Sequence, residues 1–463
     1  MKKEAVINKA IQPNLKKIPD AGFALFYKQV AELLSNPIQH LSKLRNTHGG
    51  IFKIRILHRK FIVIEDPGYF KDILQDQYKI FYKYDLSGLL TKLLGDGLIT
   101  NNGPAWLEQR KNIQPAFHKQ HVAEATYIIH DELDKLISKL ETKSPGKPIN
   151  LCSLFMELNL GIMARLLFGK KAEHELNLLS ATMNELAIQT ERQVAQIIKL
   201  PLIIPSPANQ RFKKARKKFD DILYSLINRR KKEIAAGVAS EQDVLQTLLE
   251  AGSGDPLTDK QLRNEMTTLF MAGYDTTSNT LSWLFYQISR NPEIVYRARS
   301  EMNGQAPEDL TPPKHPPVTD YITNLIKETM RFYPAVWLIV RKNISDAVIG
   351  KYFLPKRSVL LLNVYGMHHN KMYWEKPEEF QPDRFKTENI NKQNAYIYLP
   401  FGIGPRLCIG QPFAMILMQV VVSRLIKSFD FTPAGNFNIG MKPLVTLRPN
   451  PEIYVQVKPV VRV

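Results

Sequence analysis

The 463-residue sequence contains only two cysteines, Cys152 and Cys408. So few cysteines exclude a disulfide framework of the kind that stabilises small secreted domains, and they are typical of a reducing compartment. They also argue against a structural zinc site, because such a site takes about four cysteine or histidine ligands at short spacings and no second cysteine lies near Cys408. Any metal chemistry of cysteine here therefore depends on one thiol acting alone.

Long apolar runs are missing from the start of the chain. Residues 1–30 are charged throughout and hold no apolar stretch of the length that a signal peptide or a membrane span needs. We therefore expect a cytoplasmic protein without a transmembrane anchor. Linkers, low-complexity segments and internal repeats are missing as well, so we expect residues 1–463 to form a single domain despite their number.

Acidic residues are scarce relative to basic ones, since 44 Asp and Glu face 63 Lys and Arg and the formal net charge is +19. This charge raises the hypothesis of nucleic-acid binding. The densest basic runs, 211–219 and 229–233, lie on a predicted helix and are typical of a solvated helix face, and no zinc-finger spacing or RNP-type strand accompanies them. We therefore predict no nucleic-acid partner. An acidic protein or an anionic membrane surface fits the charge better.

The apolar segment 200–205, which is flanked by prolines, precedes the first basic run. It either caps a substrate entrance, the interpretation that we favour, or makes peripheral contact with a membrane.

Hydrophobic periodicity predicts a mainly α protein with small β-sheets, of the α+β class. Residues 51–57 and 61–66 alternate around a turn and predict a β-hairpin. From Asp66-Pro67 to about residue 332 the pattern is helical, and β-rich segments such as 347–365 follow the Tyr333-Pro334 break. The longest helical stretches are predicted at 121–140, 175–198 and 261–290, and a last helix is predicted at 411–426.

The most informative segment is 401–410, Phe-Gly-Ile-Gly-Pro-Arg-Leu-Cys-Ile-Gly. Its glycines allow tight turns and the close approach of a flat ligand. Because an apolar helix is predicted directly afterwards, Cys408 is expected at a helix N-terminus, where a thiolate is favoured and can bind a metal. Cys152 instead lies in an apolar run and is interpreted as a packing residue. A single thiolate beside Arg406 fits haem iron, with the guanidinium on a haem propionate.

Phe401, Gly404, Arg406, Cys408 and Gly410 resemble the F-x-x-G-x-R-x-C-x-G signature of the cytochrome P-450 haem-thiolate monooxygenases. The resemblance implies haem b, iron protoporphyrin IX, held in this loop with Cys408 as the axial iron ligand. It implies that Phe401 packs against the ligand loop and that Arg406 binds a propionate. The implied fold is a triangular helical prism with the haem between the long central helix and the cysteine-led helix.

Residues 272–277, Ala-Gly-Tyr-Asp-Thr-Thr, break the rules of a helix interior within the predicted helix 261–290. Glycine costs about 1 kcal/mol relative to alanine there, and threonine can bond a carbonyl of the preceding turn and bend the helix. Read alone, the segment is either a kink with satisfied polar groups or a functional site. Its match to the A-G-x-D/E-T-T pattern of the family implies an oxygen-binding groove beside the haem. Ala272 would then lie at the cofactor, while Asp275 and Thr276 relay protons to dioxygen.

Glu328 and Arg331 lie one turn apart near the end of another predicted helix, and read alone they form an ordinary surface ion pair. In the resembled family this pair is buried and joined by the arginine of a downstream P-x-R-F motif, which is Arg384 here. The resemblance therefore implies a structural role, in which Glu328, Arg331 and Arg384 lock the loop that presents Cys408.

Trp106 and Arg110 match the W-x-x-x-R helix of the family, and the i, i+4 spacing puts them on one helix face. Read alone, they also fit an amphipathic surface helix. The resemblance implies that both contact a haem propionate and that Arg341 is a third propionate partner. His118 is not expected to bind the iron, because a thiolate candidate exists. Arg357 departs from the family, many members of which have glycine at this sheet turn.

The resemblance covers nearly the whole chain and implies a soluble, bacterial-type monooxygenase that inserts one atom of dioxygen into a lipophilic molecule. Hydroxylation of a fatty acid, terpenoid or steroid-like substrate is expected, with apolar pocket candidates at 78–90, Met271, 335–339 and 441–447. No reductase segment follows the cysteine loop, so we expect electrons from a separate acidic ferredoxin or flavodoxin. A monomer is expected.

Three alternatives stay open at this point. A peroxygenase or an isomerase of the same fold would not need Asp275 and Thr276, and their presence argues against it. A haem-binding sensor or carrier without turnover, and a basic nucleic-acid binder, are the other two.

Overall fold

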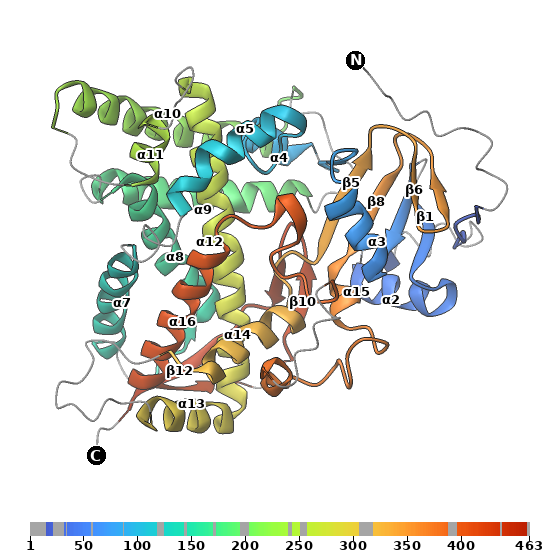
Figure 1. The fold of residues 1–463 in the computed structure, drawn as a ribbon. Helices are drawn as coiled ribbons and strands as arrows, with labels where there is room; N and C mark the ends of the chain where they lie inside the picture. The colour runs from blue at the N-terminus through green and yellow to red at the C-terminus, as the bar shows by residue number, and fades with distance from the viewer. Residues whose placement is uncertain are drawn as a thin grey trace. The chain divides into compact units, whose positions relative to one another are not determined.

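The computed structural model describes residues 15–21, 32–33, 35–56, 59–86, 88–117, 125–142, 146–169, 173–194, 203–238, 243–250, 257–304, 318–387, 396–435 and 438–460. They belong to two compact units (Figure 1). The first unit is Met1–Leu86, Val336–Glu379 and Asn391–Cys408, and the second is Ser87–Ala335, Phe380–Ile390 and Ile409–Val463. The expectation of one domain over residues 1–463 stays a prediction.

The first unit contains most of the sheet structure. Its strands pair in the order β1-β2-β8-β5-β3, parallel between β2 and β8 and antiparallel elsewhere, and β6 pairs with β7. The hairpin predicted at residues 51–66 is confirmed, because Ile51 pairs with Ile64 and Ile56 with Arg59. The strands are β1 (Ile51–Ile56), β2 (Arg59–Ile64), β3 (Phe81–Lys83), β5 (Leu338–Asn343), β6 (Ala347–Ile349), β7 (Tyr352–Leu354) and β8 (Val359–Asn363).

Short helices pack on these strands around an apolar core. Helix α3 begins where the pattern change at Asp66-Pro67 predicted, because the Asp66 side chain accepts a hydrogen bond from the Tyr69 N–H and Pro67 occupies the first turn. Ile64, Phe70 and Leu362 are among the core residues that are wholly buried. The helices of this unit are α2 (Pro37–His48), α3 (Pro67–Lys71), the π-helix η2 (Asp72–Asp76), α15 (Val364–His368) and the 3-10 helix η6 (Gly404–Arg406).

Arg357 occupies a turn conformation that usually favours glycine. Its φ is 69°, in the left-handed region, and its N–H donates to the Asn343 carbonyl at 3.0 Å. The turn that leads into β8 is therefore kept in this chain although the family's glycine is replaced.

The second unit is mainly helical, and the three longest predicted helices correspond to α7, α9 and α12. Residues 121–124 and 195–198 of those predictions lie outside the described residues. The helices are α4 (Leu89–Leu94), α5 (Gly103–Ile113), η3 (Gln114–Phe117), α7 (Thr126–Glu141), α8 (Leu151–Phe168), α9 (Glu173–Val194), α10 (Pro207–Ala235), α11 (Val244–Glu250), α12 (Asp259–Arg290), α13 (Pro292–Gly304), α14 (Asp320–Phe332), η4 (Pro382–Phe385) and α16 (Gln411–Ser428).

Small sheets complete the second unit. Strands β4 (Ile149–Asn150), β12 (Tyr454–Pro459) and β9 (Phe429–Pro433) pair in that order. Strands β10 (Gly440–Pro443) and β11 (Leu447–Asn450) form an antiparallel hairpin in which Pro443 pairs with Leu447. The predicted class, mainly α with small β-sheets, is confirmed.

Helix α12 is the longest helix of the described chain and packs against α8, α10, α14 and α16 (Figure 1). It begins at a capping box in which Thr258 and Gln261 bond each other's backbone N–H groups. Its Gly273 faces α8, since a Cβ at this position would lie 2.5 Å from Cε of Met163. This glycine therefore serves helix packing, a role that its local sequence did not indicate.

Helix α8 is, among the described residues, the only helix long and apolar enough to cross a membrane by length and composition. In the structure 67% of it is buried inside the protein, where it contacts α7, α9 and α12. Its apolar character fits a core helix.

Candidate functional site

The cysteine loop of the first unit is folded back on itself. The Cys408 N–H donates to the Phe401 carbonyl at 3.0 Å, and the Leu407 N–H donates to the Gly404 carbonyl at 3.0 Å. Gly404 has a φ of 68°, and a Cβ there would collide with the Leu74 carbonyl oxygen, so only glycine fits. Cys408 is exposed at the end of this turn. Its thiol is therefore accessible to a ligand.

The environments of the two cysteines differ as the sequence predicted. Burial raises the pKa of Cys152, which keeps it a neutral packing thiol. Cys408 is exposed and lies three residues before Gln411, where α16 begins, with Gly410 as the N-cap residue. Among the described residues, no three His, Cys, Asp or Glu side chains gather into a metal-binding group. A single thiolate remains the metal-binding candidate in that part of the chain.

Arg341 and Arg406 of the first unit form a positive site in which Arg341 is buried and Arg406 is partly exposed. Arg341 lies on β5, is 7% exposed and donates to the Val340 carbonyl at 2.9 Å. Burial and the positive charge of Arg406 lower the pKa of Arg341 to about 9. Within the described residues Arg341 has no carboxylate partner, so its charge is destabilised unless an anion binds. The two propionates of haem supply such anions, and these arginines therefore fit the cofactor.

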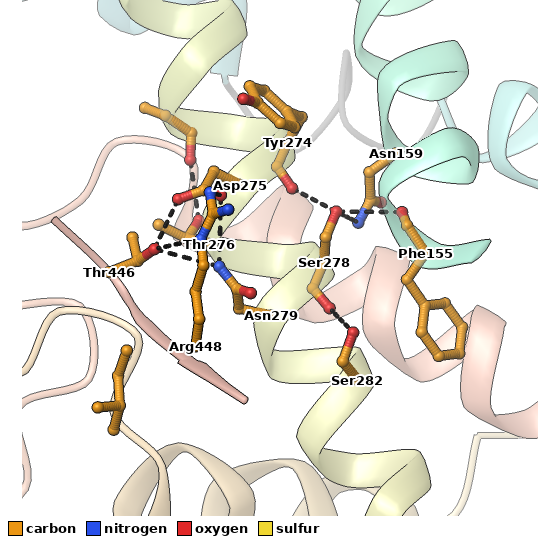
Figure 2. A network of polar contacts seen from close by, with 12 residues as sticks. Phe155, Asn159, Tyr274, Asp275, Thr276, Ser278, Asn279, Ser282, Thr446 and Arg448 are labelled. Atoms are coloured by element: carbon orange, nitrogen blue, oxygen red, sulfur yellow. Dashed lines mark hydrogen bonds and ion pairs between the residues drawn. The ribbon is translucent and has the colours of Figure 1, made fainter. Parts of the chain in front are cut away.

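In the second unit, helix α12 is buried from Leu262 to Tyr286 except at one place. That place comprises Met271, Ala272, Gly273 and Thr276, which are all partly exposed. The Thr276 hydroxyl donates to the Ala272 carbonyl at 2.8 Å, as expected for threonine in a helix (Figure 2). This open patch of α12 is the part of the helix that a ligand can reach.

Asp275 takes part in a buried polar network (Figure 2). Its Oδ2 accepts from the Thr446 hydroxyl at 2.8 Å, and its Oδ1 accepts from Asn279 Nδ2 at 3.3 Å. The Oδ1 atom also forms an ion pair with the Arg448 guanidinium. Asp275 is 7% exposed, so its charge is compensated inside the protein rather than by solvent.

Sequence reasoning missed Asn279, Thr446 and Arg448 as partners of Asp275. The segment 441–447 was predicted to line a substrate pocket only because of its apolar residues. Since Arg448 lies 173 positions after Asp275, no local pattern could have connected them. Two signals were available. Asn279 lies four residues after Asp275 on the same helix face, and an aspartate inside a predicted buried helix requires a counter-charge.

Other polar side chains of this segment also form hydrogen bonds. Ser278 donates to the Tyr274 carbonyl at 2.6 Å and accepts from Asn159 of α8 at 2.9 Å, and Ser282 donates to the Ser278 carbonyl at 2.7 Å (Figure 2). Helix α12 is continuous over residues 259–290. The segment therefore has hydrogen-bonded polar groups as well as a patch that a ligand can reach. The two interpretations of residues 272–277, satisfied polar groups and a functional site, are both compatible with this structure.

Glu328 and Arg331 form a wholly buried ion pair in the second unit. Arg331 Nε lies 2.7 Å from Glu328 Oε2, and both side chains are 0% exposed. Arg384 Nε lies 3.4 Å from Glu328 Oε1, and the Gln381 N–H donates to the same oxygen at 2.8 Å. The burial rules out the interpretation as a surface pair. The role of this cluster in locking the loop of Cys408 stays a prediction.

Trp106 and Arg110 share one face of α5. The guanidinium carbon of Arg110 lies 6.0 Å from the Trp106 ring centroid, and Trp106 is 2% exposed. The buried indole argues against a simple surface helix, while the contact of both side chains with a propionate stays a prediction. His118 lies outside the described residues.

Comparison with known proteins identifies the family. The profile of Cytochrome P450 matches residues 16–457. Cytochrome P450 4d2 of Drosophila melanogaster is 28% identical over 458 residues, 92% of this chain and 89% of the relative. Protein LUTEIN DEFICIENT 5, chloroplastic, of Arabidopsis thaliana is 29% identical over 410 residues, 84% and 69% of the two chains. The crystal structure of the cytochrome P450DA heme domain has a TM-score of 0.84 at 22% identity, covering 96% of this chain and 98% of that one.

The chain therefore belongs to the cytochrome P450 family. It is a haem-dependent monooxygenase whose cofactor is iron protoporphyrin IX, as the cysteine signature implied. The structural likeness confirms the P450 fold.

Replacing Glu328 tests the buried ion pair. Glu328→Ala leaves Arg331 buried without its carboxylate, so we expect a loss of roughly 3–5 kcal/mol in the free energy of unfolding and recovery of misfolded or haem-free protein. The matched control is Asp221→Ala, which removes the acid of an exposed pair with Lys217 and should change stability by less than about 0.5 kcal/mol. A normally haem-loaded and stable Glu328→Ala protein would contradict the assignment.

Replacing Arg341 tests the positive site. Folding lowers the pKa of Arg341 to about 9. Between about pH 8 and about pH 10 the folded arginine therefore releases its proton, whereas the unfolded arginine keeps it. Over this range the haem-free wild type should gain stability relative to Arg341→Met. Denaturant midpoints measure this difference. In loaded protein the same variant should release haem about tenfold faster, because a charge-assisted contact is lost. Unchanged haem release would exclude Arg341 as a propionate partner.

Proposed function

We propose that this monooxygenase hydroxylates a lipophilic organic molecule, with electrons supplied by a separate redox protein. The observation that carries the proposal is the open patch of α12, where Met271, Ala272, Gly273 and Thr276 are accessible in an otherwise buried helix. An apolar side chain and a hydroxyl side by side suit a lipophilic substrate and a proton-transfer step.

Each group of residues has a separate role in this proposal. Cys408 would hold the haem iron, and the bound haem would supply the activation of dioxygen. Arg341 and Arg406 bind the propionates, together with Trp106 and Arg110. Thr276 and Asp275 deliver protons, and their presence favours a monooxygenase over a peroxygenase or an isomerase. Glu328, Arg331 and Arg384 are structural.

The substrate is proposed to be a fatty acid, terpenoid or steroid-like molecule. Support comes from apolar residues that stay partly exposed, Met271 on α12 and Leu444 and Val445 in the turn between β10 and β11. Partly exposed apolar groups provide the contact area that a molecule of this kind needs.

The electron donor is proposed to be an acidic ferredoxin or flavodoxin, because a net charge of +19 attracts such a partner. A cytoplasmic monomer is part of the proposal. In the described part of segment 200–205, Ile203 is 83% exposed, which fits a peripheral membrane contact better than a cap that packs on the protein.

A spectrum of the reduced protein under carbon monoxide tests the haem-thiolate assignment. Wild type should show the strongly red-shifted Soret band that thiolate-ligated haem gives, and Cys408→Ser should lose it. The control variant Cys152→Ser removes the other thiol and should keep the band. A Soret band at the ordinary position in the wild-type protein would refute the assignment of Cys408.

The salt dependence of electron transfer tests the proposed donor. With an acidic ferredoxin at limiting concentration, the reduction rate should fall several-fold when the ionic strength rises from about 0.01 to about 0.1 M, because the Debye length shortens from about 30 to about 10 Å. Stopped-flow reduction of the haem measures this rate. A rate that does not change with salt would argue against electrostatic docking.

A further inference from the structure

The hairpin β10–β11 carries two side chains whose purpose the proposed function does not explain. Its turn consists of Leu444, Val445 and Thr446, closed by a hydrogen bond from the Leu444 N–H to the Thr446 carbonyl at 3.1 Å. Leu444 and Val445 are partly exposed, whereas Thr446 is 5% exposed. The turn thus has an accessible apolar side and a buried polar side.

The polar side of the hairpin holds the carboxylate of Asp275. Thr446 donates its hydroxyl proton to Oδ2 and accepts from Asn279 Nδ2 at 3.2 Å, while Arg448 forms an ion pair with Oδ1 (Figure 2). The exposed fractions of the two side chains of this pair are 19% for Arg448 and 10% for Asp275. Arg448 supplies a counter-charge to this buried carboxylate.

The neighbouring hydroxyl has different partners. Thr276 donates to the Ala272 carbonyl, and the acceptors on Asp275 bond Thr446, Asn279 and Arg448. The position of the Asp275 carboxylate is therefore set by the hairpin and Asn279, and not by Thr276.

We propose that Arg448, supported by Thr446, is a positioning residue that fixes the Asp275 carboxylate for proton delivery. The inference rests on the proposed function and names a residue that orients its proton donor. The carboxylate so placed takes a proton from a hydronium ion of the solvent, which leaves water, and passes it to the Thr276 oxygen, which releases its own proton towards dioxygen. The electrons come from the redox protein already proposed, so no further reactant is required.

A double-mutant cycle tests the ion pair without using activity. Arg448→Met leaves the Asp275 carboxylate without this counter-charge and should lower the denaturant midpoint of unfolding. Adding Asp275→Asn removes the uncompensated charge, so the denaturant midpoint of the double variant should return most of the way to that of the wild type. The cycle is run on haem-loaded and on haem-free protein. Additive effects of the two substitutions would overturn the assignment of Arg448 as the counter-charge.

Kinetics test the positioning role. With a substrate that wild type oxidises, Arg448→Met should lower kcat about tenfold, leave KM unchanged and enlarge the solvent isotope effect on kcat, because proton delivery becomes limiting. Arg448→Lys keeps the charge and should restore most of kcat. Lys458→Met is the matched control, since it removes an exposed cation from strand β12, outside the segments named as pocket candidates. Thr446→Val should enlarge the isotope effect in the same direction and to a smaller degree.

The outcomes separate this inference from the proposed function. Absence of turnover by wild type, with a normal carbon monoxide spectrum, would refute the proposed function. Wild-type turnover together with an Arg448→Met protein of unchanged kcat and isotope effect would refute only the role of Arg448. If Arg448→Met does not retain haem, Thr446→Val decides, and an unchanged isotope effect in that variant overturns the proposal.

Discussion

A charge buried inside a protein needs a counter-charge, and the buried charged groups of this chain meet that need in different ways. Glu328 is neutralised by Arg331, with Arg384 at 3.4 Å, and Asp275 is neutralised by Arg448. Arg341 lies beside a second arginine, which lowers its pKa to about 9. Glu328 and Asp275 therefore have counter-charges within the chain, whereas Arg341 has no carboxylate partner among the described residues. The haem propionates are the partners that we propose for it.

The same constraint explains how α12 holds reactive groups without losing its helical structure. Several polar side chains of its central segment have specific partners, such as Thr276 with the Ala272 carbonyl and Ser278 with Asn159. Because these bonds are satisfied, the helix stays continuous while a short patch remains open to a ligand. The satisfied network and the open patch together make a rigid support for chemistry.

The sequence predicted what local patterns encode. The hairpin at residues 51–66, the helix start after Asp66 and the spacing of Glu328 and Arg331 follow from short-range rules, and the structure confirms them. Long-range partners could not be predicted, because the pairing of Asp275 with Arg448 depends on tertiary packing. Gly273 makes the same point, since its contact with Met163 gives it a packing role that no local pattern reveals. The spacing of Glu328 and Arg331 also fits a surface ion pair, and only the fold shows that the pair is buried.

X-ray absorption at the iron edge of the purified, haem-loaded protein tests the central claim most directly. The claim is that one exposed thiol, Cys408, binds the iron while Arg341 and Arg406 bind the propionates. The account predicts one sulfur ligand at about 2.3 Å in addition to the four porphyrin nitrogens. An iron coordinated by nitrogen and oxygen alone would contradict it.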